Sequence, residues 1–148
     1  MSKILLITLP LAAASGVAMT FQGVLNGFLG SKVGLPGMAL IVHLIGSVSG
    51  LVVVLATRSL GNLAQLTQVP LYTLSGGLLS LFIIGGVAYT LPRSGAALGI
   101  SVILIGQLTS ALLIDHLGLL SQPRIPSTTL RIVGVLLMIL GARLLVNR

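Results

Sequence analysis

Long apolar runs, separated by short groups of charges, prolines and glycines, divide the chain into five segments. The runs are continuous rather than alternating, and most reach the roughly 20 residues that a helix needs to cross a membrane. Barrel strands would alternate, and so small a chain has too few segments to close a barrel. We therefore expect an all-α polytopic membrane protein, a single five-transmembrane-helix bundle over residues 1–148, with approximate spans 4–29, 36–57, 71–91, 95–114 and 127–146.

Breaks in the apolar pattern set the predicted boundaries. Pro36 is a good first-turn residue for the second helix. Residues 58–69 are polar enough for an exposed loop, and residues 92–95 (Pro-Arg-Ser-Gly) indicate a tight turn. The uncharged run over residues 4–31 is too long for the core of a signal peptide, so it is assigned to a first spanning helix.

The fifth helix is the weakest of these predictions. Only residues 132–142 lie between Arg131 and Arg143, which is too short to span alone. A span over residues 127–146 requires both arginines to extend toward opposite headgroup layers. The alternative is four spans followed by a helix at the membrane surface.

Composition supports a membrane protein and excludes several functions. Of the 148 residues 55% are apolar and 6% charged, and the mean hydropathy is +1.18, whereas soluble domains carry roughly a quarter charged residues. The eight Lys and Arg residues are scattered between apolar runs, which is typical of helix-end anchors and not of a nucleic-acid-binding face. There is no cysteine, no carboxylate pair, no metal-ligand cluster and no phosphate loop, so we expect no enzyme activity, no metal and no cofactor.

Small residues at helical spacing predict packing faces, because close backbone approach drives helix association in lipid. The final helix has Gly134 and Gly141 two turns apart, and we assign this face to dimer packing. A general enrichment of glycine in membrane helices is the simpler alternative. The other pairs at a spacing of four are Gly46 with Gly50, Gly76 with Ser80, and Gly95 with Gly99.

Polar residues within the spans are the candidate functional residues. In the first helix Ser15, Gln22 and Asn26 fall near one face. Either they line a cavity for substrate or they form hydrogen bonds that hold the bundle together. In the fourth helix Gln107 and Ser110 share a face, and they are candidate partners across a central cavity.

His43 lies inside the second helix and is the candidate for proton coupling or substrate contact, since histidine titrates near neutral pH. A neutral histidine making a structural hydrogen bond is the alternative. Asp115, the only acidic residue, lies near the end of the fourth helix. We expect an interfacial salt bridge with an arginine such as Arg131, and a gate or proton-access role is the other interpretation.

Three segments together resemble one family. They are the Gln22-Gly23-Val24-Leu25-Asn26 stretch followed by Leu29-Gly30, the Gly106-Gln107 to Asp115-His116-Leu117-Gly118-Leu119 stretch, and Arg131-Ile132-Val133-Gly134 through Gly141. The chain resembles the YdcZ-type small membrane proteins, a domain of unknown function grouped with the drug/metabolite transporter superfamily. The resemblance implies small-molecule transport, often described as export, and no particular substrate. It also implies that five-helix halves lie inverted in larger relatives, and that four-helix chains pair head-to-tail in the multidrug branch. That branch carries a glutamate in helix 1, and here helix 1 has no acidic residue.

Charge balance predicts dual topology. With five spans, Lys3, Arg58, Arg124 and Arg131 lie on one side, and Lys32, Arg93, Arg143 and Arg148 lie on the other. Equal numbers leave the positive-inside rule without a preference. We therefore expect an antiparallel homodimer, or pairing with an oppositely oriented paralogous chain, in the plasma (inner) membrane of a prokaryote.

The function that the resemblance implies, and that the polar residues within the spans are consistent with, is small-molecule transport, which we expect to be export by alternating access. A small polar or anionic metabolite is favoured as substrate over a lipophilic cation, because the chain has few aromatic residues and no mid-membrane carboxylate. The alternative is a non-transporting subunit that supports another membrane protein.

Overall fold

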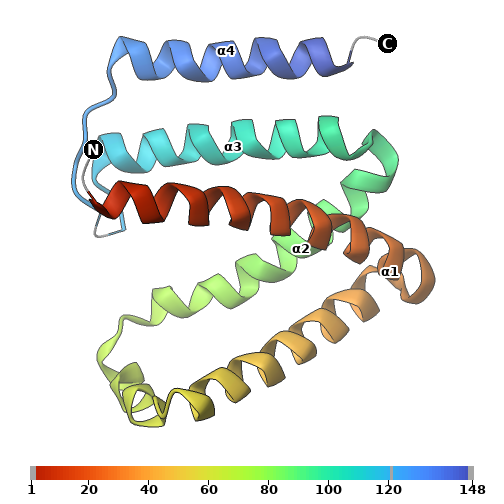
Figure 1. Cartoon of the computed structure of the whole chain (residues 1–148), viewed down its shortest axis with the longest axis vertical. Helices are drawn as coiled ribbons and strands as arrows, with labels where there is room; N and C mark the ends of the chain where they lie inside the picture. Colours follow the sequence, from red (N-terminus) through yellow and green to blue (C-terminus); the bar gives the residue numbers. More distant parts are fainter. Residues whose placement is uncertain (1–2, 121, 147–148) are drawn as a thin grey trace. The chain divides into compact units, whose positions relative to one another are not determined.

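The computed structural model describes residues 3–120 and 122–146, and within them the chain forms helices and no strand. In order, the elements are α1 (Lys3–Ala56), two 3₁₀ segments (Leu60–Gln68 and Leu71–Ser75), α2 (Gly76–Ser94), α3 (Ala96–Leu117) and α4 (Thr129–Val146) (Figure 1). Since α1 contains two helices joined at a kink, there are five α-helices in this part of the chain, and the prediction of an all-α protein is confirmed.

The reversal within α1 takes place at one residue. Gly34 has φ 77° and ψ 158°, a conformation that side chains other than hydrogen rarely tolerate, and the residues on both sides are helical. A Cβ on Gly30 would lie 3.2 Å from Leu35 Cδ2, so the missing side chain lets the second arm begin against the first. The turn is therefore tighter than the one expected at residues 30–35.

The segment expected to be an exposed loop, residues 58–69, is largely exposed but has regular structure. Leu60–Gln68 forms a 3₁₀ helix, in which residues three apart lie above one another. Leucine recurs with that period at 60, 63 and 66, and all three side chains are at least half exposed. Amide side chains recur at 62, 65 and 68 on a different face. An apolar and a polar face are typical of a segment that lies at a membrane surface.

The predicted turn at residues 92–95 is wrong in extent, because α2 continues through Pro92 to Ser94 and ends at Gly95, which has φ 80°. Proline cannot donate a hydrogen bond to the carbonyl four residues earlier, here that of Ala88. The Cβ position on Gly27 of α1 lies 2.8 Å from Pro92 Cγ and 3.4 Å from the Ala88 carbonyl oxygen. The crossing helix therefore lies close to both the ring and the carbonyl that proline deprives of its usual helical donor.

α3 and α4 form an antiparallel hairpin and pack against each other. α3 extends to Leu117, three residues beyond the predicted end, and Gly118 terminates it in the left-handed conformation while its N–H donates to the Ile114 carbonyl at 2.8 Å. The 18 residues of α4 are about 27 Å long, close to the roughly 30 Å hydrocarbon core. A complete span by α4 stays a prediction.

The helices suit a lipid environment. Three helical stretches are long and apolar enough to cross a membrane, namely Leu6–Ala56, Leu71–Ser94 and Ala96–Leu117. Large apolar side chains are exposed, including Phe82 at 80%, and Met38 is the only large side chain fully buried in the described part. Such a surface would not remain dispersed in water. The described chain divides into two compact units, one ending at Pro92 and one beginning at Arg93, and each is treated by itself below.

Candidate functional site

Two glycines bring α1 close to α2. Added Cβ atoms would lie 2.7 Å from Val87 Cγ1 and Leu91 Cδ1 at Gly23, and 2.8 Å from Pro92 Cγ at Gly27. These glycines are four residues apart, so they lie on one face of α1 and form a small-residue motif of the kind that lets membrane helices approach closely. Both glycines are buried, and so are Ala88 and Leu91 opposite them.

A small polar cavity adjoins this crossing. It has a volume of about 30 Å³ and is lined by Gln22 and Asn26 of α1 together with apolar residues of both helices: Met19, Gly23, Ile83, Ile84 and Val87. That space is enough for a water molecule. Asn26 is 7% exposed and is the buried polar residue of the described chain, whereas Gln22 is exposed.

The amide groups beside the cavity lack protein partners. Within residues 3–120 and 122–146, neither the Gln22 nor the Asn26 side chain forms a hydrogen bond. A primary amide offers two donors and two acceptor lone pairs, and leaving these unpaired at membrane depth is costly. The cavity therefore presents hydrogen-bonding capacity that water, a ligand or another helix can satisfy.

His43 connects the second arm of α1 to α2. Its Nδ1 lies 2.7 Å from the Ala39 carbonyl oxygen and its Nε2 lies 2.9 Å from Ser80 Oγ. A carbonyl oxygen can only accept, so Nδ1 carries the proton and donates to Ala39. In the neutral ring Nε2 then accepts from the Ser80 hydroxyl.

Both contacts of the ring are also compatible with a hydrogen on Nε2. When Nε2 is protonated it becomes a donor, and the Ser80 oxygen can accept because a hydroxyl both donates and accepts. The Ser80 hydroxyl hydrogen must then turn to another acceptor. Protonation of His43 thus reverses the direction of one hydrogen bond between two helices.

The remaining predicted cavity residues lie elsewhere. Ser15 is exposed on α1, and its hydroxyl donates to the Leu11 carbonyl of its own helix at 2.9 Å. Gln107 and Ser110 are exposed on α3, in the unit that begins at Arg93. The structure therefore brings Gln22 and Asn26 together, and a cavity shared by these residues with Gln107 stays a prediction.

Asp115 forms an ion pair with Arg131 across the α3–α4 hairpin. Arg131 Nη1 lies 3.3 Å from Asp115 Oδ2, and the two side chains are 39% and 36% exposed. The connecting loop folds back on the end of α3, where the Ile125 N–H donates to the Asp115 carbonyl at 2.7 Å and the Ser127 N–H donates to His116 Nδ1 at 3.1 Å. Backbone groups at the end of α3 thereby gain partners from the loop.

Gly134 and Gly141 are exposed on α4, and Cβ atoms added to either would meet nothing within 4 Å. The same open space surrounds Gly46 and Gly50 of α1. These small-residue faces do not pack on other parts of the described chain, whereas Gly23 and Gly27 do. Their use in a dimer stays a prediction.

Sequence reasoning missed two features of this region. The spacing of Gly23 and Gly27 is visible in the sequence, but the packing faces predicted above lie in the other helices. Ser80 is predicted to serve in packing and not as the partner of His43, because their contact joins residues 37 positions apart. The residues that the structure describes contain no group of three or more His, Cys, Asp or Glu side chains that could hold a metal ion.

Comparison with known families gives a match over most of the chain. A family model, DMT_YdcZ, described as "Putative inner membrane exporter, YdcZ", matches residues 7–144 and so includes nearly the whole chain. No curated protein and no solved structure matches. The family match confirms the resemblance found in the sequence motifs, and it agrees with the apolar helices described above. The chain is accordingly a membrane protein of the DMT_YdcZ family.

Proposed function

We propose that the protein exports a small polar or anionic metabolite across the inner membrane of a prokaryote by alternating access. The observation that supports this most is the pair of unpaired amide side chains, Gln22 and Asn26, beside a cavity between two membrane helices. A purely structural helix contact has no need of amides without partners. The family description as an exporter points to the same class of function.

The chemistry of the cavity favours substrates that form hydrogen bonds. Amide groups donate and accept without carrying charge. Sites for lipophilic cations use aromatic faces and usually an acidic partner. Neither feature lines this cavity, whose other lining residues are aliphatic side chains, methionine and glycine.

We further propose that His43 couples transport to proton movement. Its ring joins α1 to α2 through Ser80, and its protonation reverses that hydrogen bond. A change in the direction of one inter-helix bond can favour one of two helix arrangements, which is what alternating access requires.

The transporting form in this proposal is an antiparallel homodimer, or a pair with an oppositely oriented paralogous chain. The cavity of about 30 Å³ is far smaller than the roughly 300–1,000 Å³ of ligand pockets, so a second copy is needed to complete a substrate site. Transporters commonly form midplane sites between inverted repeats, which an oppositely inserted copy would supply.

The test is transport by purified protein in liposomes against a panel of polar, anionic and cationic compounds. Replacing Gln22, Asn26 or Gln107 with leucine should reduce transport at least tenfold while size-exclusion chromatography still gives the assembly of the unchanged protein. Ser15→Ala is a matched control, because its hydroxyl bonds only its own helix. Normal transport by all three leucine variants, or losses that always accompany disassembly, would contradict the proposal. Uptake of quaternary ammonium compounds alone would refute the substrate class.

A further inference from the structure

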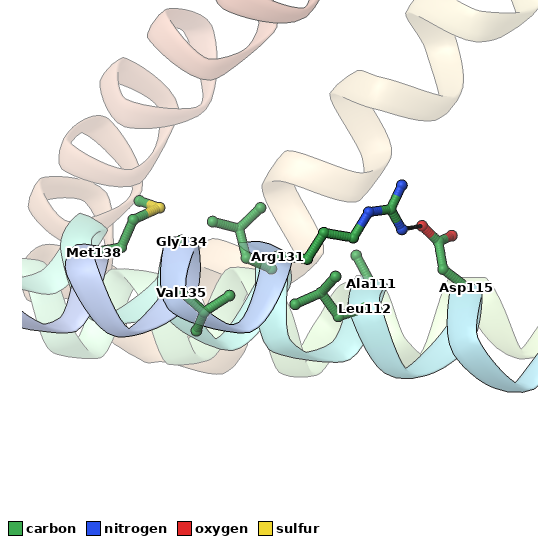
Figure 2. A pocket seen from close by; sticks show the side chains of 8 residues that line it. Ala111, Leu112, Asp115, Arg131, Gly134, Val135 and Met138 are labelled. Carbon is green, nitrogen blue, oxygen red and sulfur yellow. Dashed lines mark hydrogen bonds and ion pairs between the residues drawn. The ribbon is translucent and has the colours of Figure 1, made fainter. Parts of the chain in front are cut away.

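A larger groove lies between α3 and α4, within the unit that begins at Arg93, and it is separate from the cavity beside Asn26. Its volume is about 370 Å³, within the range of small-molecule sites. Apolar side chains line it, and the Asp115–Arg131 ion pair stands at one end while Met138 stands toward the other (Figure 2). Ala111 and Gly134 contribute almost no side chain, which leaves the space open. A ligand that fits this groove has one polar end and an apolar body.

The groove is shorter than one leaflet of a bilayer, so an acyl chain is long enough to fill it. Along α3 the lining runs from Asp115 to Leu108, and along α4 from Arg131 to Met138. Seven residues of helix measure about 10 Å, and one leaflet contributes about 15 Å of hydrocarbon. The ion pair belongs to the last turn of α3 and the first turn of α4, where spanning helices reach the headgroups. A phospholipid carries its charged headgroup and its apolar acyl chains in the same order.

The charged side chains at the polar end of the groove favour an anionic lipid. Arg131 meets Asp115 through one nitrogen at 3.3 Å, longer than the 2.7–2.9 Å of a strong charge-assisted bond. Within residues 3–120 and 122–146 its guanidinium makes no other hydrogen bond, and the remaining donors suit the oxygens of a phosphate. The connecting loop also carries Arg124, whose Nε donates to the His116 carbonyl at 3.1 Å, so this end of the hairpin has two arginines and one aspartate. We propose that the α3–α4 groove binds one acyl chain of an anionic phospholipid, whose phosphate is held by Arg131.

Because the chain has no tryptophan, a single introduced tryptophan reports fluorescence from one known position. Leu104→Trp places one on α3, a turn beyond Leu108 at the apolar end of the groove. Val102→Trp is the control at nearly the same depth but about 200° around the helix. The whole protein is placed in phosphatidylcholine vesicles that contain either phosphatidylglycerol or phosphatidylcholine brominated on its acyl chains. Quenching at position 104 should show roughly a fivefold preference for the anionic lipid, and quenching at position 102 should show none.

Gly134→Leu then fills the groove, since nothing lies within 4 Å of its Cβ position. In the Leu104→Trp background it should reduce the preference to that measured at position 102. Gly141→Leu is the matched control, because it has the same open surroundings on the same helix but does not line the groove, and it should leave the preference intact. If instead both variants change the oligomer and neither changes quenching, the groove is occupied by a second copy and the lipid proposal is overturned.

The headgroup contact is tested by a pair of opposite substitutions. Arg131→Gln should abolish the preference for the anionic lipid. Asp115→Asn removes the carboxylate that pairs with the Arg131 guanidinium, so it should keep or increase the preference for the anionic lipid. If the ion pair only stabilised the hairpin, the two substitutions would have the same effect on this preference. Equal quenching by both lipids at position 104 in the unchanged background overturns the proposal. The readout is lipid binding, so it is independent of whether the protein exports a metabolite.

Discussion

Replacing Gly27 with alanine should destabilise the protein, although alanine is the better helix former. The new Cβ would lie 2.8 Å from Pro92 Cγ and 3.3 Å from Pro92 Cδ, and a proline ring cannot rotate away as a flexible side chain can. Overpacking of this kind costs about 1–3 kcal/mol, while the gain in helix propensity returns up to about 1 kcal/mol. Gly16→Ala has the same propensity gain on the same helix, with nothing within 4 Å of its Cβ position. The difference between the two variants therefore isolates the contact with Pro92.

Thermal unfolding in detergent, followed by circular dichroism, measures that difference. At roughly 2–4 °C per kcal/mol for a chain of this size, Gly27→Ala should melt roughly 2–12 °C below Gly16→Ala. Gly23→Ala should fall between them, because the atoms in its way are the ends of the Val87 and Leu91 side chains. If Gly27→Ala melts at or above the temperature of Gly16→Ala, the close crossing of α1 and α2 is refuted.

The remaining predictions concern coupling, topology and the hairpin. His43→Gln should flatten the pH dependence of transport between about pH 5 and 8, where an unperturbed histidine titrates, and Ser80→Ala should alter the same profile; unchanged profiles in both would leave His43 a structural residue. C-terminal reporters active only inside or only outside the cell should both give signal, and two added lysines on one side should fix one orientation and impair transport; a single active reporter would exclude dual topology. Asp115→Asn should lower the free energy of unfolding by only about 0.2–1 kcal/mol, since its partner Arg131 and Asp115 itself are more than a third exposed; complete unfolding of this variant would show that the ion pair is essential to the fold.

The helices themselves follow from the sequence because lipid demands long apolar runs and internally satisfied backbones. The sequence predicts the ends of the helices less accurately. A proline near a run of polar residues indicated a turn, yet α2 continues through Pro92 because Gly27 of another helix leaves room for its ring. The sequence does not predict the 3₁₀ helix over residues 60–68, because its period of three is neither the period of an α-helix nor that of a strand.

The candidate site was predictable only within single helices. Helical periodicity placed Gln22 and Asn26 on a common face, and both line the cavity. Periodicity cannot fix how one helix is rotated against another, and a shift of one residue turns a side chain by about 100°. The sequence therefore does not give Ser80 of α2 as the partner of His43. It does show that His43 and Gln107 are polar residues within apolar runs.

Because α1 reverses direction at the single residue Gly34, its conformation depends on the thickness of the bilayer. The arm before it, residues 3–33, is about 46 Å long, and the arm after it, residues 35–56, is about 33 Å long. Only the second arm matches a hydrocarbon core of roughly 30 Å. The first must tilt or carry its outer turns among the headgroups, and its tilt changes with the thickness of the membrane. Because one backbone joint connects the arms, each change in tilt alters the angle between them, and with it the approach of the Asn26 face to its neighbours.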